Sequence, residues 1–193
     1  EFAEQLHVAV DECIKLSPIG DCSKGPHGPI GEWDVSAVTD MDSMFRDISV
    51  FNQDLSEWDV SAVTNMEEMF YGASAFNQDL SKWDVSAVVN MRYMFSGALA
   101  FNQDLSKWDV SAVADMAYMF SGALAFNQDL SNWDVSAVTD MAYMFHRASA
   151  FNRKLCGDAW VNSKANKEKM FLDSPGSISS TACTTPKPGY SEG

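Results

Sequence analysis

Residues 76–88 read FNQDLSKWDVSAV, a stretch that the chain repeats at a fixed spacing. It returns unchanged at residues 101–113 and as FNQDLSNWDVSAV at residues 126–138, so the period is 25 residues. A period of about 20 to 50 residues is the signature of a stacked-repeat architecture, in which each repeat is one structural unit. With this Phe counted as position 1, about five and a half copies cover residues 30–156.

Two hydrophobic periods occur inside each copy. At residues 83–85 Trp and Val alternate with Asp, which predicts a short strand with both apolar side chains on one face. At residues 91–98 apolar side chains recur at i, i+3, i+4 and i+7, the stripe of a helix of about two turns. Asp or Asn always precedes this stripe, as Asn90 does here, and such side chains accept hydrogen bonds from a first helical turn. Each copy is therefore predicted to hold one short strand and one short helix.

Elements this short cannot bury enough apolar surface alone, so the copies must stack on one another. The spacing of Leu80, Trp83 and Val85 matches the L-x-x-L-x-L strand of leucine-rich repeats. Stacking would place equivalent strands about 4.8 Å apart and align the apolar positions as interior ladders. We therefore predict an α/β repeat fold, a right-handed leucine-rich-repeat-like solenoid with a helical cap at each end.

The run at residues 76–95, FNQDLSKWDVSAVVNMRYMF, resembles the repeat of the BspA-like leucine-rich repeat surface proteins. Residues 9–36 also resemble the N-terminal cap of algal members of that family. The resemblance covers about two thirds of the chain. It implies a secreted or surface-displayed solenoid, linked to adhesion in some members, and it implies no reaction.

The sequence divides the chain into two caps, a solenoid and a tail. The N-terminal cap is expected to contain a helix at residues 2–15, and the C-terminal cap a covering helix from Trp160 to Phe171. The last segment is rich in Pro, Gly, Ser and Thr, which predicts a flexible tail. The predicted segments are the N-terminal cap (1–29), the solenoid (30–156), the C-terminal cap (157–172) and the tail (173–193).

Four cysteines lie outside the regular repeats, at Cys13, Cys22, Cys156 and Cys183. An even number at the two caps predicts two disulfides and an oxidising compartment, although four cysteines allow three pairings. Cysteines at opposite ends of a straight stack would be too far apart, because bonded cysteines need Cα atoms within about 7 Å. Pairing within each cap, Cys13 with Cys22 and Cys156 with Cys183, is therefore favoured. The alternative is four reduced, buried thiols in an intracellular protein.

The composition excludes some classes of partner. The 193 residues carry a formal net charge of −14, whereas a nucleic-acid or anionic-membrane surface would need clustered Lys and Arg. A basic partner is favoured instead. The sequence contains neither an apolar run of about 18 residues nor a signal peptide. We expect no membrane insertion, and we expect the chain to be the mature part of a longer precursor.

Recurring Trp and Met residues are interpreted as core ladders. Trp shares its predicted face with Val two residues later, which favours burial over a platform for stacking sugars. The histidines His7, His27 and His146 are scattered and belong to no metal or nucleophile motif, so we predict no enzymatic activity. The tryptophans of the ladder are Trp33, Trp58, Trp83, Trp108 and Trp133.

Aspartates at position 9 are the first candidate binding residues. They should point outward between Trp and Val, and stacking would align them as a column of carboxylates on the sheet face. Like charges on neighbouring strands are destabilising, so the column needs an explanation. Either the Ser two residues later bonds each carboxylate locally, or the column binds cations, meaning calcium or the basic side chains of a partner. Its members are Asp34, Asp59, Asp84, Asp109 and Asp134.

A second acidic column at position 4 falls at a turn, where Asp more often serves the backbone. Its members are Asp54, Asp79, Asp104 and Asp129.

Tyrosines on the outer face of the predicted helices, Tyr93, Tyr118 and Tyr143, are the second candidate surface. Exposed tyrosines suit recognition because they offer a large area and lose little rotamer freedom. The function expected from the sequence is a non-catalytic binding or adhesion module that holds a protein or glycan ligand on its acidic sheet face. A calcium-dependent structural scaffold is the alternative, and we expect no cofactor unless calcium binds.

Overall fold

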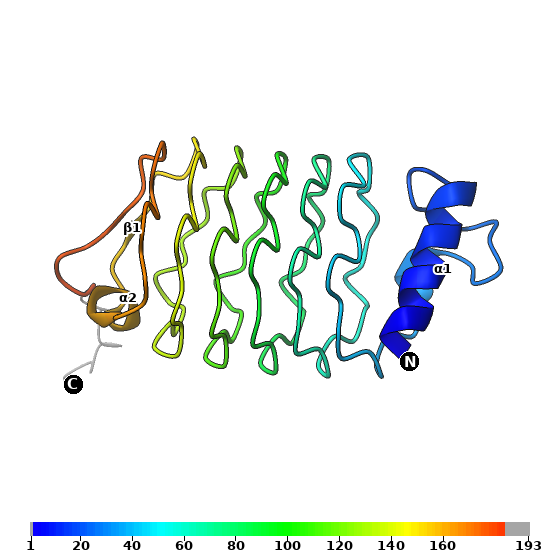
Figure 1. Cartoon of the computed structure of the whole chain (residues 1–193), viewed down its shortest axis with the longest axis horizontal. Coiled ribbons are helices and arrows are strands. Elements are labelled where there is room, and N and C mark those ends of the chain that lie inside the picture. Colours follow the sequence, from blue (N-terminus) through cyan, green and yellow to red (C-terminus); the bar gives the residue numbers. More distant parts are fainter. Residues whose placement is uncertain (1, 184–193) are drawn as a thin grey trace, which may run out of the picture.

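The computed structural model describes residues 2–183 as a row of stacked coils, each coil being one repeat (Figure 1). One end of the row is covered by helix α1, and the other by the segments that follow the last coil. The regular elements are α1 (Phe2–Leu16), the 3-10 helix η1 (Ile30–Glu32), β1 (Lys154–Leu155), α2 (Asp158–Asn162) and β2 (Ser177–Ile178).

The short helix predicted in each repeat is wrong. Residues 91–98 form successive turns, because only every second N–H group bonds locally. Met94 N donates to Met91 O (3.2 Å), three residues back, whereas Met91 N donates to Asp115 O in the next coil (3.0 Å). Positive φ angles at positions 18 and 22, such as 56° at Tyr93 and 72° at Gly97, are also incompatible with a right-handed helix.

The short strand predicted at residues 83–85 is also absent, and the parallel pairing lies elsewhere in the repeat. Residue pairs at position 15, such as Asn90 with Asp115, form parallel bridges from coil to coil. From position 16 to position 22, alternate N–H groups donate forward to the following coil at 2.6–3.0 Å. The coil-to-coil ladder therefore occupies the segment in which we predicted a helix. The assignment to the right-handed leucine-rich-repeat class stays a prediction.

Stacked phenylalanines form the centre of the core. The rings at position 20 and at position 1 of the next repeat stack closely, with Phe70 and Phe76 centroids 4.0 Å apart. Equivalent rings in successive coils also stack, as Phe70 and Phe95 do at 5.5 Å. Among the described side chains, 11 phenylalanines belong to this double row.

The core assignment of the Trp and Met ladders is confirmed. The methionines at positions 16 and 19 are buried in every regular coil. Trp83 is only 4 % exposed, and its indole Nε1 donates to Leu55 O of the preceding coil (3.0 Å). The same bond recurs at Trp58, Trp108 and Trp133. Trp33 differs, because it remains partly exposed at the start of the row.

The covering helix predicted from Trp160 to Phe171 is wrong, since α2 ends at Asn162. Beyond it the chain repeats the ladder once more: Met141 N donates to Asn166 O (2.8 Å), and Phe145 N to Met170 O (2.9 Å). This last copy is one residue longer than the others, because Asn166 pairs with Asp140 across 26 positions. The coil-to-coil ladder therefore runs on to Leu172, which accepts a bond from Arg147 N.

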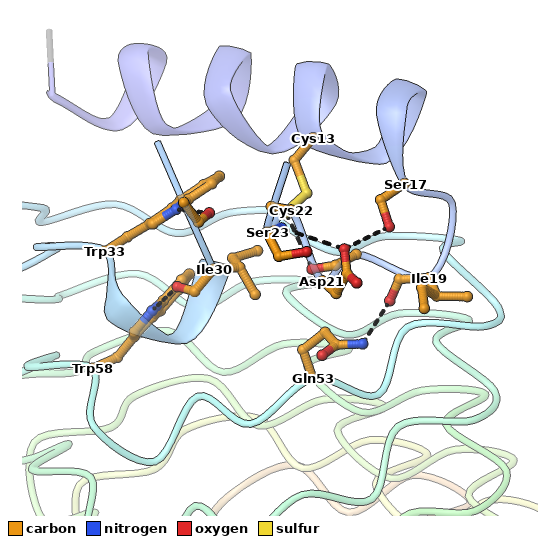
Figure 2. The surroundings of a disulfide bond; sticks show 12 residues. Cys13, Ser17, Ile19, Asp21, Cys22, Ser23, Ile30, Trp33, Gln53 and Trp58 are labelled. Carbon is orange, nitrogen blue, oxygen red and sulfur yellow. Dashed lines mark hydrogen bonds between the residues drawn. A yellow bond between two sulfur atoms is a disulfide. The ribbon is translucent and has the colours of Figure 1, made fainter. Parts of the chain in front are cut away.

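Disulfides join cysteines within each end of the row. Cys13 of α1 is bonded to Cys22, as Figure 2 shows, and Cys156 is bonded to Cys183. These are the pairs that the sequence favours, and they indicate an oxidising compartment. In the first part of the predicted tail, β2 pairs in parallel with β1. The rest of the tail, residues 184–193, lies outside the described residues.

Replacing Trp83 with Ala should destabilise the stack by about 3 to 5 kcal/mol, because it empties a large aromatic site in the middle of the core. Urea unfolding followed by circular dichroism will measure the change.

Trp83→Phe is the matched control, since it keeps an aromatic six-membered ring and removes the smaller, N–H-bearing ring of the indole. It leaves Leu55 O without its partner, so a smaller loss of about 1 to 3 kcal/mol is expected. A loss below about 1 kcal/mol for the Ala variant would contradict the buried position.

Candidate binding surfaces

The aspartates at position 9 each form a local hydrogen-bonded turn. Oδ1 of Asp84 accepts a bond from Ser86 Oγ (2.6 Å) and another from Ser86 N (3.0 Å). The same pair of bonds recurs at Asp34, Asp59 and Asp109. All five members of the column are exposed. Within the described residues, only one oxygen of each carboxylate makes such a bond, which leaves the other facing solvent.

These local bonds explain how the chain tolerates a column of like charges. The Ser86 hydroxyl lowers the pKa of Asp84 most, and the Ser86 N–H lowers it further. Burial and the neighbouring carboxylates of Asp109 and Asp59 raise this pKa by less, so it stays below its ordinary value of 3.8. Each carboxylate is therefore stabilised by its own coil more than it is repelled by its neighbours.

The column does not lie on a sheet, which corrects the predicted position of the site. Residues 83–85 make no strand, so the aspartates lie on an edge of the stack formed by turns. The position 4 aspartates belong to a similar edge, since Asp79 Oδ1 accepts a bond from Ser81 N (2.9 Å). We name the two columns together the acidic edge: Asp34, Asp59, Asp84, Asp109 and Asp134 at position 9, and Asp54, Asp79, Asp104 and Asp129 at position 4.

The charge of the acidic edge changes along the stack. Position 7, between the two columns, is Glu32 and Glu57 in the first two coils and Lys82 and Lys107 in the next two. Lys82 Nζ lies 3.2 Å from Glu57 Oε1, and both side chains are largely exposed. Negative charge is therefore most concentrated at the N-terminal end.

The three predicted tyrosines come together as one stack. Ring centroids are 4.5 Å apart between Tyr93 and Tyr118, and 4.7 Å apart between Tyr118 and Tyr143. They lie in the turns of the coil-to-coil ladder, each with a positive φ angle, and not on a helix. Because the rings cover one another, each tyrosine is half-buried.

Arg92 completes this surface, although the sequence analysis did not single it out. Its guanidinium lies 4.8 Å from the Tyr93 ring centroid and 5.6 Å from that of Tyr118. Asp115 Oδ2 lies 3.7 Å from Arg92 Nη1, so the positive charge of Arg92 is already paired. The groups of the tyrosine stack are thus largely paired with one another and with Arg92, whereas the acidic edge keeps unpaired carboxylate oxygens.

Clusters of metal ligands and membrane-spanning helices are both absent from residues 2–183. No three His, Cys, Asp or Glu side chains in this range converge as metal ligands would. None of the described helices has the length and apolar character needed to cross a membrane.

A row of stacked 25-residue coils with a disulfide at each end defines a repeat protein. The chain belongs to the family described as "Mycoplasma protein of unknown function, DUF285", whose family model matches residues 21–114 and again residues 79–181. The two matches overlap, as expected for a repeated sequence. No curated protein and no solved structure matches the chain.

The lowered pKa values of the edge aspartates predict a defined acid sensitivity. Their contribution to stability is present above the unfolded pKa of about 3.8 and is lost as pH falls through the lower folded pKa. The variant D59N/D84N/D109N should therefore lose less stability than the parent when urea unfolding is repeated from about pH 6 down to pH 2.

The variant S61A/S86A/S111A provides the matched control. It keeps all three charges and removes only the hydroxyl donors, so its acid sensitivity should be intermediate. Equal acid sensitivity in all three proteins would contradict the assigned role of the serine bonds.

Proposed function

We propose that this chain is a non-catalytic binding module that holds a basic protein partner along its acidic edge. The observation that carries the proposal is the repetition of the Asp–Ser turn: five successive coils each present a carboxylate in the same orientation. Side chains that are already fixed lose little conformational freedom on binding, which favours association.

The charge distribution supports a basic partner. The net charge of −14 attracts cations over a distance, and a surface of one sign raises the rate of association with a partner of the opposite sign. A glycan ligand has less support, because the four tryptophans of the central coils are buried and offer no stacking surface.

An extracellular location fits this proposal. Disulfides persist in oxidising compartments and are rare in the cytosol, and both ends of the stack carry one. We propose a secreted or surface-displayed protein, a leucine-rich-repeat-like solenoid in which turns take the place of the helix. The resemblance to the BspA-like surface proteins adds adhesion as the expected biological role.

The test uses a short peptide of alternating Lys and Arg as the probe. D59N/D84N/D109N should bind this peptide about tenfold more weakly than the parent at low salt, because three steering charges are removed. The salt dependence of the association rate should also fall. Surface plasmon resonance over a series of salt concentrations measures both.

The matched control is D40N/D115N/D140N, which removes the same charge at position 15. Asn65 and Asn90 occupy that position naturally, so the variant should fold and bind nearly as the parent does. An equal loss of affinity in both triple variants would show that only net charge matters. Undiminished binding by D59N/D84N/D109N would move the site to the tyrosine stack.

The alternative, a calcium-dependent scaffold, has its own test. A ligand that binds only the folded state raises the midpoint of thermal unfolding. After chelation, millimolar calcium should leave the parent midpoint unchanged if the edge serves a basic partner. A rise that is present in the parent and absent from D59N/D84N/D109N would favour the calcium scaffold.

A further inference from the structure

A groove lies between α1 and the first coil, at the N-terminal end of the acidic edge. Its volume is about 440 Å³, within the range of pockets that hold small ligands. Leu6 of α1 lines one wall, and Trp33 and Val38 of the first coil line the other. Figure 2 shows the Trp33 indole between α1 and the coil that carries Trp58.

The groove exists because the Trp ladder ends there. Inside the stack, each indole is buried between coils and donates to a carbonyl of the preceding coil. Within the described residues, helix α1 takes the place of a coil before that of Trp33, so Trp33 Nε1 donates instead to Gly28 O (3.1 Å) and the ring stays partly exposed. His27 meets this ring edge-on, with centroids 5.8 Å apart. Helix α1 covers the end of the core but does not fill the space that a further coil would take.

Two of the polar residues that line the groove are acidic, and the other two are Gln5 and His27. Glu32 and Asp34 both line it and both are exposed, and no Lys or Arg of the described part of the chain is among the lining residues. Asp34 is also the first member of the position 9 column, so the groove continues directly into the acidic edge. Ser36 N and Ser36 Oγ both donate to Asp34 Oδ1, and Asp34 Oδ2 makes no hydrogen bond within the described residues.

We propose that this groove is the anchor for one arginine side chain of the basic partner. This inference rests on the proposed function, because the groove would fix one end of the basic partner that lies along the acidic edge. A planar guanidinium stacks on an indole and bonds carboxylates in a fork, so Trp33 offers the stacking face and Asp34 and Glu32 the acceptors. Lysine, a compact and strongly hydrated charge, would fit this combination less well.

The first experiment titrates blocked arginine (N-acetylarginine amide) into the intact protein and follows the Trp33 indole N–H by NMR. A single residue cannot span the edge, so this signal reports the groove alone. Trp33→Leu and Trp33→Phe lack this indole, so binding to these variants and to the parent is compared through the backbone N–H signal of Asp34. Trp33→Leu should weaken binding about fivefold, because the cation–π contact is lost. Trp33→Phe should weaken binding less than Trp33→Leu does, because it keeps an aromatic ring. Blocked citrulline, which has the same shape without the charge, should shift the signal much less.

The matched pair of variants is Asp34→Asn and Asp134→Asn. Both occupy position 9 and carry the same local turn, but only Asp34 lines the groove. Asp34→Asn should weaken blocked-arginine binding about threefold, since one ionic acceptor is removed, and Asp134→Asn should leave it unchanged. Equal effects of the two variants, or no shift of the Trp33 signal, would overturn the proposal.

The D59N/D84N/D109N variant separates this inference from the proposed function. It should bind blocked arginine as the parent does, even though its affinity for the basic peptide is reduced. Peptide binding that depends on the edge without any arginine binding in the groove would leave the proposed function standing and reject the anchor. Arginine binding in the groove, together with peptide binding that D59N/D84N/D109N does not weaken, would reject the proposed function of the edge and leave the arginine site standing.

Discussion

The alternation of backbone hydrogen bonds in the coil-to-coil ladder is the constraint on which the structure depends. Between positions 16 and 22, the N–H groups at even positions donate to the next coil, and those at positions 19 and 21 donate to a carbonyl three residues back. The N–H group at position 17 donates to the Asp or Asn side chain at position 15, as Arg92 N does to Asn90 Oδ1. This alternation satisfies the backbone without a helix or a continuous strand, as buried polar groups require. It also fixes the register, because a shift of one residue would exchange local donors for coil-to-coil donors. The ladders of Phe, Trp and Met are aligned by this register.

Much of this arrangement could be predicted from sequence, because a fixed period forces equivalent side chains into columns. Burial of Trp83 followed from its spacing with Val85, and the disulfide pairs were favoured by the length of a stack. The prediction of a helix at residues 91–98 was wrong because a chain of turns produces the same apolar spacing of i, i+3, i+4 and i+7. Gly97 was the available signal, since a glycine repeated at position 22 indicates a positive φ angle that a helix forbids. Arg92 could not be found this way, because its position varies from copy to copy.

The forward direction of the ladder makes the two ends of the stack chemically different. Within residues 2–183, the N–H groups of Lys169 and Phe171 in the last coil have no following acceptor. This coil also carries Lys167 at position 16, where every earlier copy has Met. Its Nζ donates to Ser163 O (2.8 Å), and burial lowers the pKa of this amine. A charged side chain at a core position discourages further stacking, a device that also protects the edges of β-sheets.

Periodicity limits what an acidic edge can recognise by itself. Identical carboxylates at a regular spacing would let a basic partner bind equally well after sliding by one coil, so the edge gives affinity without a unique position. Two features break this equivalence at the same end of the molecule. Position 7 is acidic only in the first two coils, and the partly exposed ring of Trp33 occurs only where the ladder begins. A partner anchored at Trp33 would therefore be aligned along the whole edge, and the irregular first coil would determine the register of binding on the regular ones.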